Sequence, residues 1–395
     1  MHSNHAAPSP RAGPRLEIAD VFRRFRHLLG PLPADHLRVI DNILDCRTGK
    51  LGGHLRVCSD CEFREQSYNS CRNRHCPKCQ SLTKEKWVEN RVKDLLPVPY
   101  FHVVFTIPHE LNHIALQNKK VVYDILFKTA SATLKEVALR KYGGEMGFTA
   151  VLHTWGQNLM EHPHLHIIVA GGALTPKKNA WVSCKTDYLL PLKILSMVFR
   201  GKFLFELENR YDELSFHGRL IPLKGKDRFK EVLTQASKNT WVVYAKKPFA
   251  GPKQVLSYLG QYTHRIAISN HRLIKIENGK IYFRYRDSSE DNKTKILALE
   301  PKEFMRRFLL HVLPKKFVRL RHYGFLGNRL RQEKLSACRT ILSAEPPKPL
   351  EEKTWKERLK ELTGRDIDLC PRCGEKLLES TLAILQKKIL LPDTS

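Results

Sequence analysis

The central part of the chain carries short apolar runs that are typical of buried strands. These runs are rich in β-branched and aromatic residues and occupy 100–108, 148–155, 164–172 and 241–245. Residues 272–287 predict a β-hairpin, because Asn278-Gly279 favours a tight turn between two strand-like runs. The pattern therefore predicts an antiparallel sheet in the centre of the chain.

Helical spacing of apolar residues separates these runs. Near the N-terminus, Val21, Phe22, Phe25 and Leu28 fall on one face of a predicted helix. The predicted helices occupy 17–29, 81–96, 114–141, 190–213 and 252–265. Strands and helices in this arrangement indicate an α+β fold, and a Cys-rich segment at 46–80 precedes it.

The chain is strongly basic. Its 395 residues include 68 Lys and Arg against 40 Asp and Glu, which gives a formal net charge of +28. Residues 301–334 alone carry ten basic and two acidic side chains. An excess of this size indicates a polyanionic partner, with nucleic acid as the first candidate.

A membrane surface is the second candidate partner, but we find no anchor for it. No apolar run approaches the ~20 residues that span a bilayer. Residues 1–14 are rich in Pro, Ala and His and have no apolar segment of the kind found in signal peptides. We expect this segment to be disordered, and we expect the protein to be cytoplasmic and without a membrane partner.

Six of the ten cysteines lie between Cys46 and Cys79. Two Cys-x-x-Cys knuckles, Cys58–Cys61 and Cys76–Cys79, supply the four thiolates of a tetrahedral Zn²⁺ site. Free core cysteines do not explain two knuckles within 22 residues. Further ligands lie nearby and leave an alternative or binuclear site open: Cys46, His54, Cys71 and His75.

A third knuckle, Cys370–Cys373, follows near the end of the sequence. One knuckle cannot fill a zinc shell, so its partner is Cys338 or another subunit, unless the knuckle is a metal-free turn. Basic residues are interleaved with the N-terminal cysteines and indicate either DNA contact or a solvated face: Arg64, Arg72, Arg74, Lys78, Lys84 and Lys86.

Three histidines alternate in the segment HPHLH. On a strand, His162, His164 and His166 share one face and Leu165 lies on the other. Three imidazoles on one face favour a divalent-metal site over a core, and the apolar residues that follow argue against a surface histidine run. Ile168 stands where the His-x-His-x-Asp-His hydrolases have Asp, which argues against that class.

Tyr258 and Tyr262 are four residues apart on a predicted helix, so their hydroxyls emerge on one face. A core stripe with Val255 and Leu259 would have the same spacing. Gly260 is a poor helix former, which suggests that another backbone approaches the helix there. A Tyr beside a metal-bound phosphate can act as a nucleophile.

Taken together, these segments resemble the two-tyrosine HUH transposases of rolling-circle insertion sequences. The matching pieces keep the family's order over roughly 40–330. They are SYNSCRNRHCPKCQ, PYFHVVFTIPHEL, HTWGQNL, HPHLH, YAKKPFAGPKQVLSYLGQYTHRIAISN and HVLPKKFVRLRHYGFLGN. The resemblance implies an HUH endonuclease domain, an RRM-like antiparallel sheet with the histidines on a central strand and the tyrosine helix beside it.

The resemblance also implies the chemistry. His164 and His166 would hold Mg²⁺ or Mn²⁺ against the scissile phosphate of single-stranded DNA, and Tyr258 and Tyr262 would form 5′-phosphotyrosine links. For the third metal ligand, His162, Gln157 and Gln261 are candidates, and the strand-face pattern favours His162. Lys246, Lys247 and Arg265 flank the tyrosine helix and are expected to neutralise DNA phosphates.

We expect four regions: a disordered N-terminus (1–14), a zinc-binding and DNA-binding domain (15–99), a catalytic domain (100–335) and a C-terminal tail (336–395). Transposition at transposon ends and targets is the expected activity, at the prokaryotic nucleoid. Alternatives are a relaxase or replication initiator with the same chemistry, a zinc-dependent DNA-binding regulator and a hydrolase of small phosphoesters. The sequence does not fix the oligomeric state.

Overall fold

The computed structural model describes most of the chain. The described residues are 16–79, 81–185, 189–246, 254–255, 260, 267–287, 290–291, 293–346 and 353–379, without the side chains of 81–83. Several predictions fall outside these residues: the disordered segment 1–14, Lys247, Tyr258, Gln261, Tyr262 and Arg265.

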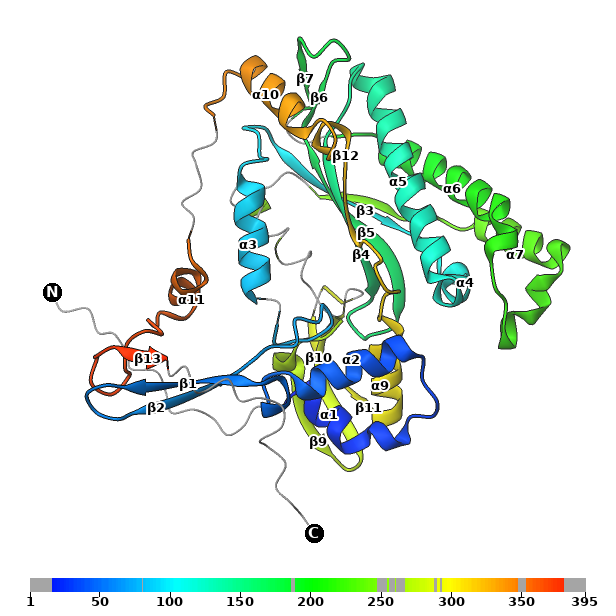
Figure 1. The fold of residues 1–395 in the computed structure, drawn as a ribbon. Coiled ribbons are helices and arrows are strands. Elements are labelled where there is room, and N and C mark those ends of the chain that lie inside the picture. The colour runs from blue at the N-terminus through cyan, green and yellow to red at the C-terminus, as the bar shows by residue number, and fades with distance from the viewer. Residues whose placement is uncertain are drawn as a thin grey trace.

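A five-stranded antiparallel sheet forms the centre of the molecule (Figure 1), in the order β12-β4-β5-β3-β8. Its strands are β3 (Tyr100–Thr106), β4 (Phe148–Trp155), β5 (Glu161–Ala170), β8 (Val243–Lys246) and β12 (Leu320–Tyr323). The four predicted strands and the α+β class are confirmed, and β5, which carries the histidines, is the central strand as expected.

Helices cover one face of this sheet. Leu165, Ile167 and Val169 of β5 point into a large buried cluster with residues of α5 (Lys119–Tyr142) and α6 (Leu192–Asn209), and α7 (Lys226–Lys238) packs next to α6. The helix predicted at 114–141 is two helices, α4 (Asn112–Gln117) and α5. Asn118 separates them, because its side chain bonds both the backbone N–H and the carbonyl of Ser215 instead of continuing a single helix.

A second core joins the N-terminal helices to a segment far along the chain. Buried residues of α1 (Ile18–Phe25) and α2 (Ala34–Asp45) pack with α9 (Pro301–Leu310) and a three-stranded sheet. The strands of that sheet are β9 (Leu273–Glu277), β10 (Lys280–Asp287) and β11 (Lys293–Leu299). The hairpin predicted at 272–287 is confirmed. Residues of the predicted 15–99 region therefore share a core with the predicted catalytic region.

The Cys-rich segment and the C-terminal arm (353–379) lie on one side of the molecule (Figure 1). β1 (Gly53–Cys58) and β2 (Arg64–Tyr68) form a hairpin to which β13 (Leu377–Glu379) adds a third strand. The helices α3 (Ser81–Val92) and α11 (Trp355–Thr363) lie on this side, whereas α10 (Arg331–Ile341) packs against the turn at Gly324–Leu326 that follows β12. A short pair of strands, β6 (Gly172–Leu174) and β7 (Trp181–Ser183), lies near the end of β5. Among the described helices we find no span with the length and apolar character needed to cross a membrane.

Gly324, which follows β12, holds the edge of the central sheet close to the loop before β4. It has a left-handed backbone (φ +64°), and an added Cβ would overlap the carbonyl oxygen of Met146. We expect Gly324→Ala to lower the free energy of unfolding by at least about 2 kcal/mol, through backbone strain and steric overlap. Chemical denaturation measures this loss.

Gly201 is the matched control. It lies inside α6 with nothing within 4 Å of its added Cβ. Gly201→Ala is expected to raise the free energy of unfolding by about 1 kcal/mol, through helix propensity alone. Equal effects of the two substitutions would show that the contact with Met146 does not constrain the fold.

Candidate metal centres

Three histidines meet on one face of the central sheet. His164 and His166 lie on β5, on the face opposite the one that α5 covers, because their neighbours Leu165 and Ile167 point into the helical core. His153 of β4 lies directly across from His164 in the strand register. One ring nitrogen of each histidine lies within 4.8 Å of the others, so the group can hold one metal ion.

His153, and not the expected His162, is the histidine that the structure groups with His164 and His166. The side chain of His162 is exposed, and its ring is not part of the three-histidine group. His162 contributes its backbone carbonyl, which accepts a 2.5 Å hydrogen bond from Nδ1 of His164. The backbone carbonyl of Gln157, another candidate, accepts a hydrogen bond from the guanidinium of Arg272. The motif HTWGQNL contains His153. Only the register between β4 and β5, which the sequence does not give, shows that His153 lies next to His164.

Hydrogen bonds on the far side of the rings fix which nitrogens face the metal position. Nδ1 of His164 donates to the His162 carbonyl, and Nδ1 of His166 lies 2.8 Å from Nε2 of His102 on β3. The carbonyl of His162 can only accept, so Nδ1 of His164 carries a proton and Nε2 of the neutral ring can bind a metal; this Nε2 lies 3.1 Å from Nε2 of His166. Adjacent ligands of an octahedral ion with bonds near 2.1 Å lie roughly 3 Å apart, so the pair fits such an ion.

Buried aromatic and polar groups hold this arrangement. Trp155 stacks on His153 with 4.6 Å between ring centroids. The ring of Trp155 also contacts the ring of His311 edge to face, and Nε2–H of His311 donates to the carbonyl of Leu159. Burial, with a smaller contribution from Lys246, lowers the pKa of His102 to about 4. His102 is therefore neutral at physiological pH, and its Nε2 can accept a hydrogen bond from Nδ1 of His166.

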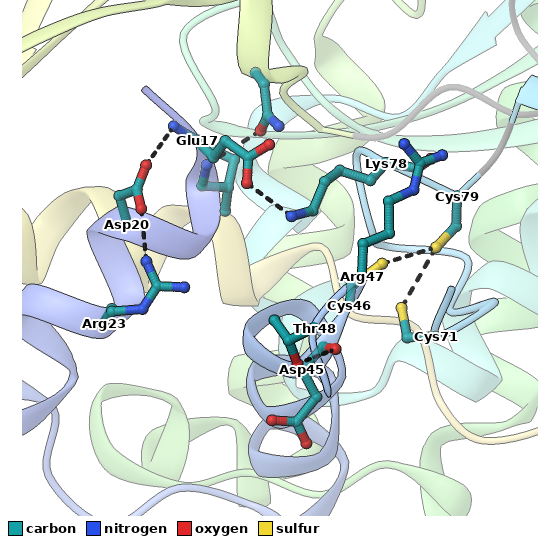
Figure 2. A network of polar contacts seen from close by, with 12 residues as sticks. Glu17, Asp20, Arg23, Asp45, Cys46, Arg47, Thr48, Cys71, Lys78 and Cys79 are labelled. Carbon is teal, nitrogen blue, oxygen red and sulfur yellow. Dashed lines mark hydrogen bonds and ion pairs between the residues drawn. The ribbon is translucent and has the colours of Figure 1, made fainter. Parts of the chain in front are cut away.

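Four cysteines form a separate centre at the end of α2. Cys46, Cys71, Cys76 and Cys79 have their sulfurs within 4.8 Å of one another. The Sγ–Sγ distances are 3.2 Å for Cys46–Cys79 and 3.5 Å for Cys71–Cys79 (Figure 2). Tetrahedral zinc with Zn–S bonds of about 2.3 Å places its sulfurs roughly 3.8 Å apart, so the group fits Zn²⁺. Hydrogen bonds from Cys71 and Cys76 lower the pKa of Cys79, which favours the thiolate.

Polar contacts tie this cysteine centre to α1. Lys78, between the two cysteines of the knuckle, forms a 2.7 Å ion pair with Glu17, and Arg47 donates to the carbonyl of Lys78 (Figure 2). Cys46 and Cys76 are fully buried in the core that α1, α2 and α9 share. The centre therefore orders the junction between the Cys-rich segment and this core.

The predicted zinc shell of Cys58, Cys61, Cys76 and Cys79 is wrong in its grouping. Cys58 and Cys61 lie at the far end of the β1–β2 hairpin, beside Cys370 and Cys373, whereas Cys76 and Cys79 lie with Cys46 and Cys71. The five-residue step from Gly53 to Cys58 in an extended strand spans roughly 17 Å, which separates the two knuckles. His54 and His75 belong to neither group, and burial lowers the pKa of His75 to about 3. Cys338 is buried in another core.

The predicted DNA-binding and tyrosine residues are described only in part. Lys246 lies on edge strand β8, across from His102, and so on the histidine face. Gln254, Val255 and Gly260 of the predicted helix 252–265 are helical. An added Cβ at Gly260 would meet Val88 Cγ2 at 2.6 Å and Lys84 Cε at 3.0 Å, so side chains of α3, and not a backbone, approach this glycine.

Comparison with known proteins assigns the family. Residues 17–107 match the family model described as "Transposase zinc-binding domain", and residues 147–334 match the one described as "Putative transposase". No solved structure matches the chain.

Two curated relatives cover most of the chain. It is 48% identical over 376 residues to "Putative transposase y4qJ" of Sinorhizobium fredii (strain NBRC 101917 / NGR234), a match that covers 92% of this chain and 94% of the relative. It is 25% identical over 373 residues to "Transposase for insertion sequence element IS801" of Pseudomonas savastanoi pv. phaseolicola, covering 89% and 85%. With the resemblance confirmed in this way, the chain belongs to the insertion-sequence transposases of the IS91 and IS801 family.

Proposed function

We propose that this transposase cleaves and rejoins single-stranded DNA in rolling-circle-type transposition. Tyr258 and Tyr262 are the proposed nucleophiles, and each forms a 5′-phosphotyrosine link. The observation that carries the proposal is the group of His153, His164 and His166 on the central sheet of a chain that belongs to a transposase family. The proposed substrates are transposon ends and targets, at the nucleoid.

The histidine group is the proposed site for Mg²⁺ or Mn²⁺. His164 and His166 would bind the ion through Nε2, and His153 would supply the third nitrogen. A divalent ion bound there polarises the phosphate that the nucleophile attacks. Because the opposite nitrogens of His164 and His166 are engaged by the His162 carbonyl and by His102, the rings are oriented before the ion and the DNA arrive.

Val255, which precedes the two tyrosines in the sequence, packs on the same side of the sheet as the histidines. Ile168 follows His164 and His166 on one face of β5, and Val255 shares a buried cluster with Ile168 and Tyr100. Val255 is three residues before Tyr258, and Gly260, which contacts α3, lies between Tyr258 and Tyr262. These two anchors support a position of the tyrosine segment beside the metal site.

The edge of the sheet offers groups that suit a single strand of DNA. Tyr244 and Lys246 of β8 lie on the histidine face, and Tyr244 is half exposed. Tyr244 is two strands away from His166, roughly 10 Å at the usual strand spacing. An exposed aromatic ring can stack on a base and an adjacent Lys can pair with a phosphate, which is how proteins bind single strands without reading their sequence.

The proposed reaction conserves the phosphodiester bond energy. The Tyr oxygen attacks the phosphorus, the bond from phosphorus to the 3′ oxygen breaks, and the hydroxyl proton of Tyr ends on the released 3′-hydroxyl. Attack of a 3′-hydroxyl on the phosphotyrosine reverses these changes and joins the strands. A second Tyr allows a second strand to be cleaved while the first link persists, and neither step consumes ATP.

The metal site predicts a split between cleavage and DNA binding. We expect His164→Ala, His166→Ala and His153→Ala each to abolish adduct formation with a labelled single-stranded oligonucleotide in Mg²⁺. DNA affinity should change by no more than about twofold, because it comes mainly from many Lys and Arg contacts to phosphates. Adduct gels and fluorescence anisotropy measure the two quantities.

His162→Ala is the matched control, because it keeps the backbone carbonyl that His164 uses. It should retain cleavage and Mn²⁺ binding. If His162→Ala abolishes Mn²⁺ binding while His153→Ala retains it, the third ligand is His162 and the assignment of His153 fails.

His102 is predicted to act as a positioning residue through His166. His102→Ala removes the acceptor for Nδ1–H of His166, and we expect Mn²⁺ affinity to fall about 10–100-fold, as for other residues that orient a metal ligand. Isothermal titration calorimetry with Mn²⁺ measures this affinity without relying on activity. His102→Gln restores an acceptor and should recover part of the affinity. An unchanged Mn²⁺ affinity in His102→Ala would contradict this role.

The tyrosines are tested by Phe substitutions, which keep the ring and remove the nucleophilic oxygen. Tyr258→Phe and Tyr262→Phe should each stay folded, bind single-stranded DNA and fail in a transposition assay, although one or both may still cleave an isolated oligonucleotide. The double variant should form no covalent adduct. Normal transposition by both single variants would show that the pair is only a core stripe, and an adduct in the double variant would place the nucleophile elsewhere.

A further inference from the structure

Two cysteine pairs more than 300 residues apart in the sequence meet on the C-terminal arm. Sγ of Cys58 lies 3.4 Å from that of Cys373, and Sγ of Cys61 lies 3.6 Å from that of Cys370. All four sulfurs lie within 4.8 Å of one another. The zinc-binding family model ends at residue 107, so it does not include Cys370 and Cys373.

The geometry of this group fits zinc and excludes a disulfide. Disulfide sulfurs lie about 2.05 Å apart, and all four cysteines are free. The sulfurs of a tetrahedral zinc site lie roughly 3.8 Å apart. Each pair also sits on a tight turn closed by backbone hydrogen bonds: the N–H of Cys58 donates to the carbonyl of Phe63, and that of Cys370 donates to the carbonyl of Glu375. The N–H of Arg372 donates to Sγ of Cys370.

The apolar core around these cysteines is too small to hold the arm alone. Among the described residues, the cluster consists of Cys58, Cys370 and Leu377, with Cys61 and Phe63 packed against it. A region with so little buried apolar surface usually needs a metal to stay folded. The cysteines themselves make up most of this core, so a zinc ion would supply the missing stabilisation.

Contacts on both sides of the cysteine group attach the arm to the N-terminal hairpin. β13 pairs with β1, with Leu377 opposite Cys58 and Glu379 opposite Arg56. Arg56 donates to the carbonyl of Ile367, and Arg365 forms a 2.8 Å ion pair with Glu65 of β2. These contacts join the arm to β1 and β2 beside the cysteine group.

The arm also lies against α3, as Figure 1 shows. Arg358 of α11 forms an ion pair with Glu89 of α3, and the Arg358 side chain is only 13% exposed. Val88 of α3 faces Gly260, and Glu89 is the next residue, so it points roughly 100° away around the helix. One face of α3 therefore contacts the tyrosine segment and another contacts the arm.

We propose that Cys58, Cys61, Cys370 and Cys373 bind a second structural zinc ion, which fastens the C-terminal arm (353–379) to the β1–β2 hairpin and braces α3 against the segment of Gly260. The zinc site stands on its own geometry. The consequence for Tyr258 and Tyr262 depends on the proposed function.

Metal content tests the second zinc ion directly. Native mass spectrometry and elemental analysis of the full chain should find two Zn²⁺ per chain in the wild-type protein, which needs no variant. Cys370→Ser with Cys373→Ser should retain one Zn²⁺. Cys184→Ser, a buried cysteine in neither group, is the control and should retain two. One Zn²⁺ in the wild-type protein, or equal zinc content in the wild type and the double variant, would overturn the site.

Limited proteolysis tests whether the ion fastens the arm. Trypsin should cut after Arg358 slowly in the wild-type protein, because this side chain is nearly buried, and at least tenfold faster in the double Ser variant. Equal rates would show that the arm is held without the metal. Both readouts are independent of DNA cleavage, so a failure of the proposed tyrosine chemistry leaves them unaffected.

The bracing of α3 is tested by the rate of adduct formation. In the double Ser variant this rate should fall several-fold while Mn²⁺ affinity at the histidines stays at the wild-type value. An unchanged adduct rate in a variant that has lost one zinc would overturn the link to α3.

Discussion

The register between β4 and β5 is the constraint on which the candidate catalytic site depends. Successive residues of a strand face opposite sides, so a shift of one residue would turn His164 and His166 toward α5 and expose Leu165. The register is held by Leu165, Ile167 and Val169, which are fully buried against the helices. Burial of each such side chain contributes about 1.5–3 kcal/mol, so the helical core on one face fixes the positions of the histidines on the other.

Burying imidazoles carries a cost that hydrogen bonds must offset. His102 and His164 are almost fully buried, and a buried polar ring without a partner would destabilise the sheet by a few kcal/mol. The chain meets this cost with the same contacts that orient the ligands: the His162 carbonyl serves His164, and His102 serves His166. Stability and the geometry of the proposed metal site therefore favour the same rotamers.

Much of the central sheet could be predicted from the sequence, because its strands are apolar on one face and flanked by strong turn residues. Side-chain alternation within one strand was enough to pair His164 with His166. The same rule could not find His153, because its contact with His164 arises between strands whose register a single sequence does not give. Spacing likewise identified the knuckle of Cys58 but not its partner. That grouping depends on the length of the β1–β2 hairpin and on β13, which pairs with β1 although it lies about 300 residues later in the sequence. Tyr258 and Tyr262 stay predictions.

The two kinds of centre differ in a way that suits two roles. Four thiolates are soft, strongly binding ligands, and they leave no coordination position open, so such a group serves to fasten chain segments together. The histidine group has three neutral nitrogens on one face of a sheet, and imidazole alone favours softer ions over Mg²⁺. A hard ion with an octahedral shell would need oxygen ligands for its remaining positions, and phosphate oxygens of bound DNA can supply them. An incomplete protein shell thus ties the proposed ion to the substrate, whereas the cysteine shells tie theirs to the fold.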